Sequence, residues 1–303
     1  MTVPEWLVPW VIRATGRNRI FLSEEAARRH VERSARSPKP FGPPQRLAHE
    51  VDISMVVRDG WPVYTVSPSG GFRSPPAPTG SVVYVHGGGW VNEVARQHWQ
   101  LIARIAVESR TTVVVPIYPL IPAGTAGPVV AGIVDIIREC RDEYGDPRLV
   151  GDSAGGQIAL SAAQVLRDEH GITLGRTVLI SPAVDLTWSN PGIPEVQPDD
   201  PWLAVPGGHH LSEVWRGDLE VTDPRVSPIF GDLAGLGPVT IFSGTHDILC
   251  PDARLLAAKL ENSGVDVEYH EVPARLHVYP ILPTASGRDA RTLITAQLAD
   301  PGS

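Results

Sequence analysis

Short apolar runs alternate with helix-type segments through the middle of the chain. The runs at 81–85 and 111–115 are apolar at nearly every position, which is typical of strands buried on both faces. Between such runs, the segment 128–144 places apolar residues along one stripe of a helix: Val130, Ile133, Val134 and Ile137. Alternation of this kind predicts an α/β fold, with a mostly parallel central sheet and helices on both faces.

The same patterns predict the remaining elements. An Asp59-Gly60 turn is expected to join two antiparallel strands at 51–57 and 61–66. Further strands are predicted at 148–150, 177–180, 239–243 and 265–272. Further helices are predicted at 97–109, 154–170, 251–263 and 284–298.

Two segments interrupt this alternation. Near the amino end, Pro9 is expected to kink or split a first amphipathic helix, and Ser23 can cap a second one that ends in the proline-rich stretch 37–44. Residues 187–237 are rich in proline, glycine and tryptophan and are too long for a plain connection in a compact domain. This second segment is therefore predicted to form a lid or cap.

Charge and cysteine content exclude several classes of protein. A net charge of −8 over 303 residues argues against binding to nucleic acid through a basic surface. Cys140 and Cys250 are far apart and are expected to be reduced, packed thiols. No apolar stretch is long enough to span a membrane, and the first residues lack a basic region and a cleavage site. We therefore expect a cytoplasmic protein without a membrane span. The sequence leaves open whether this protein forms a homodimer.

One serine lies in a turn that is typical of catalytic nucleophiles. Residues 151–155 read G-x-S-x-G, between a predicted strand and a predicted helix. The flanking glycines allow a sharp turn that would lift the Ser153 hydroxyl above the sheet edge. The alternative is that Ser153 only caps the helix; the strand–turn–helix context favours the nucleophile.

A second glycine-rich turn, residues 86–89 with the sequence HGGG, follows the first buried strand. Its glycines would let the backbone N–H groups of Gly87 and Gly88 point into a cavity, where Ala154 could add a third. Such N–H groups suit an oxyanion hole. The third glycine of a dinucleotide-binding fingerprint is missing, because Asn92 follows. A purely structural turn stays open as the alternative. His86 itself is expected to hold the glycine loop.

A serine at neutral pH needs a base and an acid that orients it. Asp247 and His277 each follow a predicted parallel strand, so both should lie at the same sheet edge as Ser153. Among rival acids, Asp252 is expected to cap a helix and Glu271 lies inside a strand.

No metal site is predicted. His209 and His210 are adjacent, so on a helix they point in different directions. No second pair of ligands accompanies them.

These motifs resemble the hormone-sensitive-lipase-like branch (bacterial family IV esterases) of the α/β-hydrolase fold. The likeness rests on residues 86–89, on 151–156, and on 223–228 with the sequence DPRVSP, and it spans roughly 50–280. It implies a cap made of residues 1–48 and an insertion at about 187–222, with 49–303 as the catalytic domain. The loop at 118–123 lacks the arginine and glutamate of the family pattern, which puts its packing and the substrate preference in question.

Together the residues and the resemblance predict a serine carboxylesterase that hydrolyses small to medium acyl esters through an acyl-enzyme. The predicted reaction needs no cofactor, and its partner is a small-molecule ester. An amidase, a lactonase or an acyltransferase would use the same residues, and an inactive ligand-binding receptor is the remaining alternative. Candidate substrate-binding residues are Trp90, Asp152 and Trp188.

Overall fold

The computed structural model describes residues 2–69 and 80–299, and these form an eight-stranded sheet. Its strands are β1 (Val51–Arg58), β2 (Trp61–Pro68), β3 (Ser81–Val85), β4 (Thr112–Pro116), β5 (Pro147–Asp152), β6 (Thr177–Ile180), β7 (Val239–His246) and β8 (Val267–Leu276). Their order is β1-β2-β4-β3-β5-β6-β7-β8. Strands β3 to β8 run parallel, while β1 and β2 join the edge antiparallel through the predicted Asp59-Gly60 turn.

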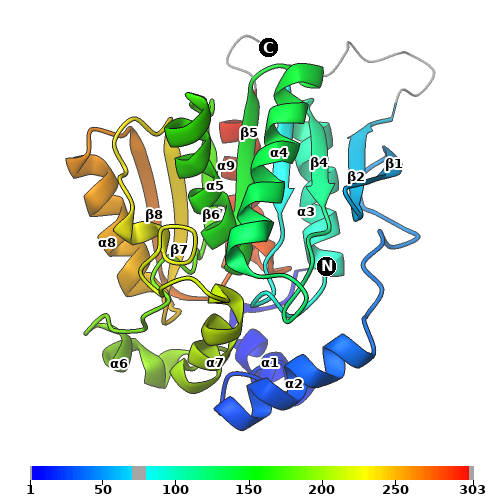
Figure 1. Cartoon of the computed structure of the whole chain (residues 1–303). Helices are drawn as coiled ribbons and strands as arrows, with labels where there is room; N and C mark the ends of the chain where they lie inside the picture. Colours follow the sequence, from blue (N-terminus) through cyan, green and yellow to red (C-terminus); the bar gives the residue numbers. More distant parts are fainter. Residues whose placement is uncertain (1, 70–79, 300–303) are drawn as a thin grey trace.

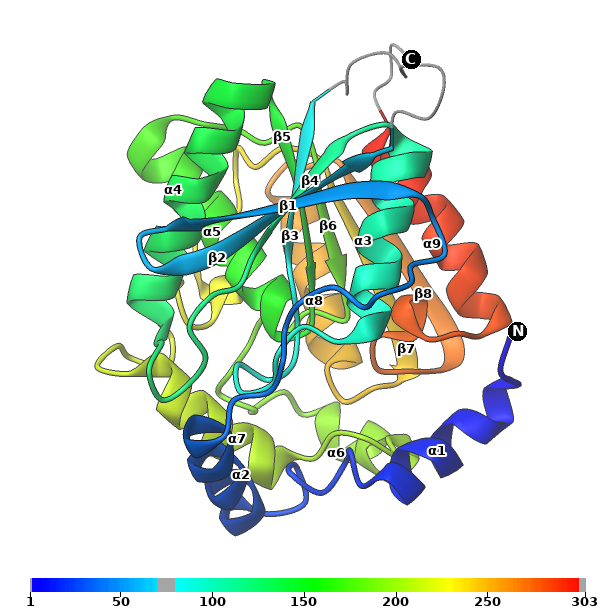
Figure 2. The same cartoon turned by 90° about the vertical axis from the view of Figure 1, so that its right-hand side faces the viewer.

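Helices cover both faces of the sheet (Figures 1 and 2). On one face lie α4 (Ala126–Tyr144), α5 (Ala154–His170) and α8 (Cys250–Asn262), and on the other lie α3 (Arg96–Ser109) and α9 (Ala285–Leu298). The predicted α/β fold, with a mostly parallel sheet between two helical layers, is confirmed.

Burial explains why the sequence patterns were so clear. All five residues of β3 and of β4 are buried, because each strand has a helical layer on either side. The predicted stripe of α4 faces the sheet, with Ile133 fully buried. Cys140 on the same helix and Cys250 on α8 are free and buried.

A third group of helices lies beyond the carboxyl ends of the parallel strands (Figure 1). We call it the helical layer: α1 (Val8–Thr15), α2 (Glu24–Arg36), α6 (Ile193–Val196) and α7 (Val205–Arg216), with the short 3₁₀ turns Glu5–Leu7 and Gln197–Asp199. Its first two helices come from the amino end, and its last two come from the long segment between β6 and β7.

Local sequence explains how the helical layer is built. Pro9 lies in the first turn of α1, where its missing N–H costs nothing, so the helix begins at Val8 instead of continuing from the preceding 3₁₀ turn. Ser23 caps α2 as predicted, since its Oγ accepts a hydrogen bond of 3.2 Å from the Ala26 N–H. Helix α2 packs against α7, and the Gly207 N–H donates to the Phe21 carbonyl at 2.9 Å.

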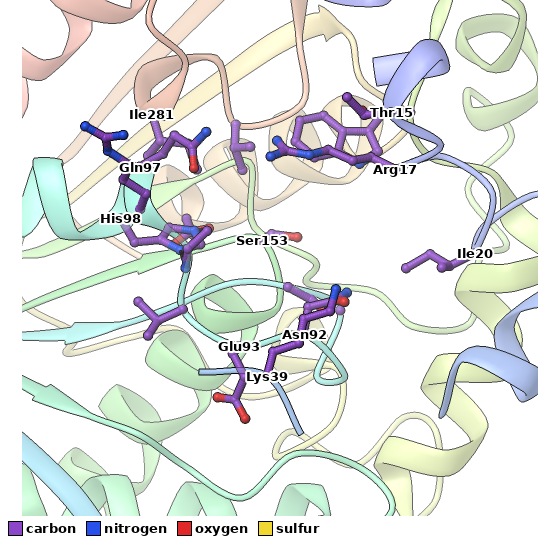
Figure 3. A pocket seen from close by; sticks show the side chains of 18 of the residues that line it. Thr15, Arg17, Ile20, Lys39, Asn92, Glu93, Gln97, His98, Ser153 and Ile281 are labelled. Atoms are coloured by element: carbon purple, nitrogen blue, oxygen red, sulfur yellow. Dashed lines mark hydrogen bonds and ion pairs between the residues drawn. The ribbon is translucent and has the colours of Figure 1, made fainter. Parts of the chain in front are cut away.

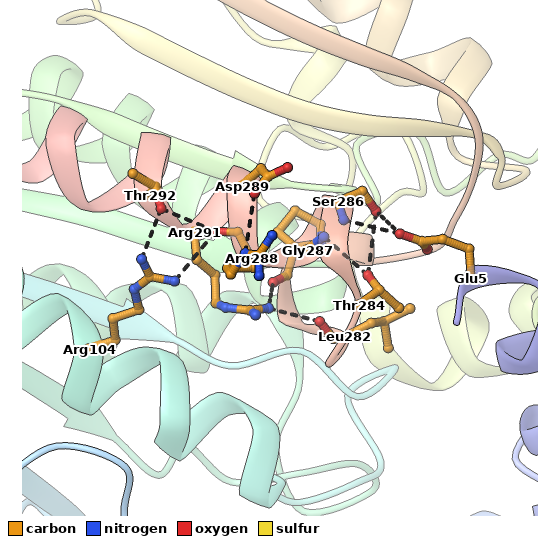
Figure 4. A network of polar contacts seen from close by, with 11 residues as sticks. Glu5, Arg104, Leu282, Thr284, Ser286, Gly287, Arg288, Asp289, Arg291 and Thr292 are labelled. Carbon is orange, nitrogen blue, oxygen red and sulfur yellow. Dashed lines mark hydrogen bonds and ion pairs between the residues drawn. The ribbon is translucent and has the colours of Figure 1, made fainter. Parts of the chain in front are cut away.

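Polar contacts tie the amino end to the start of α9 (Figure 4). The Glu5 carboxylate accepts hydrogen bonds from the Ser286 N–H (3.1 Å) and hydroxyl (2.7 Å). Arg291 donates to the carbonyls of Pro280 (2.6 Å) and Leu282 (2.8 Å), and Thr284 caps the helix. These contacts fix the loop that precedes α9, which includes the 3₁₀ turn Tyr279–Ile281.

None of the helices within the described ranges combines the length and the apolar character that a bilayer crossing requires.

Candidate active site

Ser153 lies at the turn between β5 and α5. Its backbone has φ 53° and ψ −119°, a conformation that costs about 1–3 kcal/mol for a residue with a side chain. The turn is held because the Ser153 N–H donates to the Ile180 carbonyl at 2.8 Å. Gly155 allows α5 to approach β3 closely, since a methyl group there would overlap the Val85 carbonyl oxygen. The predicted sharp strand-to-helix turn is therefore present.

Asp247 and His277 each follow directly on a parallel strand. Strands β7 and β8 run three and four residues beyond their predicted ends at 243 and 272, because pairing continues past an irregularity between Gly244 and His246. The carboxyl ends of parallel strands share one edge of the sheet. Both side chains therefore lie at the edge that also carries Ser153.

A continuous chain of hydrogen bonds joins the three side chains. The Asp247 Oδ2 to His277 Nδ1 distance is 2.9 Å, and the His277 Nε2 to Ser153 Oγ distance is also 2.9 Å. Because the carboxylate accepts from Nδ1–H, Nε2 is left to accept from the serine hydroxyl. The acid is itself oriented, since Asp247 Oδ1 accepts from the Leu249 N–H at 3.0 Å.

The charge on the imidazole is set by competing effects. Burial alone would lower the pKa of His277, which is 4% exposed. Nearby carboxylates, Asp247 first, outweigh burial and hold this pKa above its ordinary value. The imidazole is thereby made a stronger base than a free histidine.

The glycine loop differs from expectation at one position. The Gly87 N–H donates to Asp152 Oδ1 at 3.0 Å, so this N–H is occupied and is not free for an oxyanion. Asp152 also accepts from the Tyr84 hydroxyl (2.9 Å) and contacts His98 Nε2 (3.1 Å). His98 Nδ1 accepts from the Ala95 N–H at 2.9 Å, so Nε2 carries the proton that it donates to Asp152.

Three other N–H groups at this edge have no acceptor among the described residues: those of Gly88, Gly89 and Ala154. Gly88 has φ 128°, a conformation open only to glycine, and a side chain there would overlap the Asn92 carbonyl oxygen. Two of the predicted donors, Gly88 and Ala154, are thus free, and Gly89 joins them in place of Gly87.

His86 supports the glycine loop from beneath, as predicted. Its Nδ1 donates to the Gly87 carbonyl at 2.8 Å, and its ring stacks on Tyr118 with centroids 4.5 Å apart. The Tyr118 hydroxyl donates to the His86 carbonyl at 2.7 Å. Burial lowers the pKa of His86 to about 4, so the ring is neutral near pH 7.

A cavity of about 910 Å³ opens between these residues and the helical layer (Figure 3). Ser153, His277 and Asp152 contribute to its lining. The other two predicted substrate-binding residues, Trp90 and Trp188, are not among the described residues that line this cavity. Trp90 is buried and donates to Gln157 Oε1 at 3.2 Å, and Trp188 donates to Ser212 Oγ at 3.1 Å.

Sequence reasoning missed a carboxylate that reaches the site from the helical layer. Asp200 Oδ2 accepts from the Ile248 N–H at 3.0 Å, next to Asp247, and Oδ1 accepts from the N–H groups of Trp202 (2.7 Å) and Leu203 (2.9 Å). The Trp202 ring meets the His277 ring edge-on, with centroids 5.7 Å apart. Burial and the charge of Asp247 raise the pKa of Asp200. The segment around Asp200 has no periodicity, so no pattern marked it.

No cation site is evident in the part of the chain that the structure describes. No group of three or more histidine, cysteine, aspartate or glutamate side chains there is arranged to hold a metal ion. His209 and His210 lie in α7.

Asp252 was expected to cap α8, and this is wrong. The N-cap position is Leu249, and Asp252 lies in the first turn, where its Oδ1 accepts from Asn190 Nδ2 at 2.7 Å. Burial, followed by the charge of Asp185, raises the pKa of Asp252 to about 7. Glu271 lies in β8 as predicted and pairs with Arg254 at 2.8 Å.

The buried Asp252 predicts a pH-dependent stability. A carboxyl group whose pKa rises on folding stabilises the fold below its unfolded pKa, near 4, and this contribution is lost as the pH rises through about 7. Asp252→Asn removes the titration. The free energy of unfolding of the variant relative to wild type should therefore rise by about 1–4 kcal/mol between pH 4 and pH 8. Urea unfolding across this range measures it.

The control is Asp135→Asn, at an exposed carboxylate on α4. Its difference from wild type should change little between the two pH values. Parallel pH curves for Asp252→Asn and wild type would contradict the prediction.

Comparison with known proteins agrees with this geometry. A family model described as alpha/beta hydrolase fold matches residues 82–281. A triacylglycerol lipase of Mycobacterium tuberculosis is 34% identical over 234 residues, which are 76% of this chain and 47% of the lipase, so the chain spans about half its length. Carboxylesterase NlhH of the same species is 30% identical over 237 residues, or 72% of this chain and 73% of the relative.

Solved structures share the fold over almost the whole chain. One from Staphylococcus aureus has a TM-score of 0.85 at 26% identity and covers 94% of this chain and 96% of that one. An esterase from the bacterial hormone-sensitive lipase family has a TM-score of 0.77 at 23% identity, with 91% of each chain covered, and at that identity it indicates the fold alone. The chain therefore belongs to the α/β hydrolase fold family, and its likenesses include the bacterial hormone-sensitive-lipase group to which its motifs pointed.

Proposed function

We propose that the chain is a serine carboxylesterase that hydrolyses small to medium acyl esters through an acyl-enzyme intermediate. The observation that carries this proposal is the chain of hydrogen bonds from Asp247 through His277 to Ser153. The curated relatives named as a lipase and a carboxylesterase support the same class of reaction. An amidase or a lactonase would need the same three residues, so the substrate has to be tested.

The first half of the reaction forms the acyl-enzyme. Ser153 Oγ attacks the carbonyl carbon of the ester while its proton passes to His277 Nε2. Asp247 keeps the imidazole in the required tautomer and stabilises the imidazolium that forms. When the tetrahedral intermediate collapses, the bond to the alcohol oxygen breaks and His277 returns the proton to the leaving alcohol.

The second half repeats these steps with water. His277 Nε2 takes a proton from water, the oxygen attacks the acyl carbon, and the carboxylic acid leaves as Ser153 Oγ regains the proton. All groups that move protons belong to the chain.

The oxyanion of both tetrahedral intermediates needs fixed donors. We assign this role to the N–H groups of Gly88, Gly89 and Ala154, because these are free while the Gly87 N–H is held by Asp152. One such donor contributes about 3–4 kcal/mol to the stability of the transition state. Asp152 is then a positioning residue, since it fixes the start of the glycine loop against the turn that carries Ser153.

The substrate would enter beneath the helical layer, which we propose acts as a cap built from residues 1–48 and 187–222. A cavity of about 910 Å³ falls within the usual range for small-molecule sites. Ile281 and Trp202 contribute apolar surface to it, which suits an acyl chain.

Labelling and an ester series test this function together. A fluorophosphonate probe should modify Ser153 covalently, as identified by peptide mass spectrometry, because only an activated serine reacts quickly. A series of 4-nitrophenyl esters from acetate to dodecanoate should show highest kcat/KM at short to medium chains. A receptor without catalytic function would neither react with the probe nor hydrolyse any ester. An amidase or lactonase would react with the probe but prefer amides or lactones.

A further inference from the structure

One wall of the cavity is strongly basic, and the proposed reaction does not use it. Six cationic side chains line the cavity, two from α2, three from the segments that follow α1 and α2, and one from α3: Arg17, Arg19, Arg29, Arg33, Lys39 and Arg96. The whole chain is acidic, with 34 acidic and 26 basic residues. The basic wall, as we call these six residues, is therefore a local reversal of the charge of the protein.

The basic wall is largely unpaired. Arg29 lies 3.5 Å from Glu25, but the other five have no acidic side chain within 4 Å among the described residues. Arg28 of the same helix, which is not among the residues that line the cavity, pairs with both Glu25 (2.6 Å) and Glu32 (2.8 Å). Helix α2 thus pairs Arg28 and, at longer range, Arg29, and leaves Arg33 at the cavity without an acidic partner among the described residues.

Acidic side chains are fewer than cations in the lining of the cavity. Two acids contribute to the described lining, Glu93 and Asp152. Asp152 is buried and already holds three donors. Burial raises the pKa of Glu93, and one of its oxygens is buried without a partner.

The placement of the cations fits a ligand bound at the serine. In Figure 3, Arg17 and Lys39 approach the cavity from opposite sides, with Ser153 between them in this view. Neutral polar groups lie among them, since His30 Nε2 contacts Asn92 Oδ1 at 2.9 Å on the same lining. Burial, and after it the charges of Lys39 and Arg33, lower the pKa of His30.

We propose that the natural substrates are esters that carry a negative group, a carboxylate or a phosphate, which the basic wall binds while Ser153 attacks the ester. This rests on the proposed function and names its substrate class. A cleft lined by charge of one sign raises the local concentration of oppositely charged ligands, and on-rates by about 10- to 1,000-fold. Arginine also binds carboxylate and phosphate oxygens in a two-pronged geometry.

Matched pairs of esters test the proposal. Mono-4-nitrophenyl glutarate carries a terminal carboxylate, and 4-nitrophenyl valerate has the same chain length without it. For phosphate, 4-acetoxyphenyl phosphate is compared with phenyl acetate. For wild type, the ratio of kcat/KM for the charged ester to that for the neutral ester should be highest at low salt. It should fall as salt is added, since salt screens exposed charges.

Two double variants give the decisive comparison. Arg17→Gln with Arg33→Gln removes two charges of the basic wall, and Arg13→Gln with Arg36→Gln removes two arginines of α1 and α2 outside the described lining of the cavity. The charged-to-neutral ratio should fall about 3- to 20-fold in the first variant. It should stay within about twofold of wild type in the second. The charged ester whose kcat/KM ratio falls in the first variant shows whether the basic wall binds a carboxylate or a phosphate.

The outcomes separate this inference from the proposed function. If neutral esters are hydrolysed but the ratio is unaffected by salt, or falls equally in both double variants, the basic wall does not select substrates. If no ester is hydrolysed and the fluorophosphonate leaves Ser153 unmodified, the proposed function fails and this inference fails with it.

Discussion

Ser153→Ala should lower kcat/KM for the best 4-nitrophenyl ester by about 10⁶-fold, because it removes the atom that forms the acyl-enzyme. The fold should be kept. Apart from its contact with His277, the Ser153 side chain makes no hydrogen bond within the described residues. The backbone bonds that hold the turn, such as Ser153 N–H to the Ile180 carbonyl, do not involve the hydroxyl. Steady-state kinetics and thermal unfolding on the same preparation measure both effects.

Ser161→Ala is the matched control, since Ser161 is a buried serine of α5, the helix that follows Ser153. Its hydroxyl donates to the Pro224 carbonyl at 2.7 Å and accepts from Gln157 Nε2 at 3.0 Å. Loss of these contacts should cost about 1–3 kcal/mol of stability. Ester hydrolysis should stay within about tenfold of wild type. Turnover by Ser153→Ala close to that of wild type would reject Ser153 as the nucleophile.

The fold was predictable because its strands are buried on both faces. In β3 and β4 every position must be apolar or small, so the pattern did not depend on register. Helix α5 was predicted at its observed bounds, since the Ser153 turn precedes it and Gly171 ends it. Strand ends were harder to place, because β7 ends in half-buried polar residues, β8 passes through the exposed Pro273 and Ala274, and pairing continues past an irregularity that no composition signal marks.

The residues of the candidate site were predictable to the extent that topology constrains them. Asp247 and His277 follow parallel strands, and parallel strands bring their carboxyl ends to one edge. Which N–H groups of the glycine loop are free was not predictable. That depends on the Asp152 side chain, which turns back to accept from Gly87. A hydrogen bond between residues 65 positions apart leaves no trace in local spacing.

Asp200 and the basic wall could not be predicted from the sequence, for a related reason. Asp200 and five of the six residues of the basic wall lie in the helical layer or in the segments next to it, and the position of this layer over the site is set by packing between segments that are distant in the sequence. In α2 the charges resemble those of any solvated helix face, and only the structure separates Arg28, which pairs with Glu25 and Glu32, from Arg33, which lines the cavity. Sequence spacing can therefore locate chemistry at a sheet edge more readily than it can describe what lies over that edge.

Asp247→Asn should lower kcat/KM by about 10⁴-fold while the nucleophile stays in place. An asparagine can present its NH₂ group to His277 Nδ1, which then becomes an acceptor. The proton would move to Nε2, where it blocks proton transfer from Ser153.

The pH profile of Asp247→Asn should change as well. In wild type, kcat/KM should rise with pH and level off above a midpoint higher than 6.5, because the carboxylates raise the pKa of His277 and the neutral imidazole is the base. Without Asp247 the midpoint should move to lower pH.

Asp200→Asn distinguishes the charge of a nearby carboxylate from the orientation of the imidazole. Asp200 adds negative charge near His277, but its hydrogen bonds go to the Ile248, Trp202 and Leu203 N–H groups and not to the ring. This variant should lower the midpoint too, yet leave the imidazole tautomer intact, so its loss in rate should be far smaller than that of Asp247→Asn. Asp252→Asn, at a buried acid whose side chain pairs with Asn190, should change neither quantity. If instead Asp200→Asn lowered the rate as much as Asp247→Asn, Asp247 alone would not be the acid that orients His277, and this role would belong to Asp200 and Asp247 together. The reason is that a carboxylate that acts through charge alone cannot fix which nitrogen of the ring holds the proton.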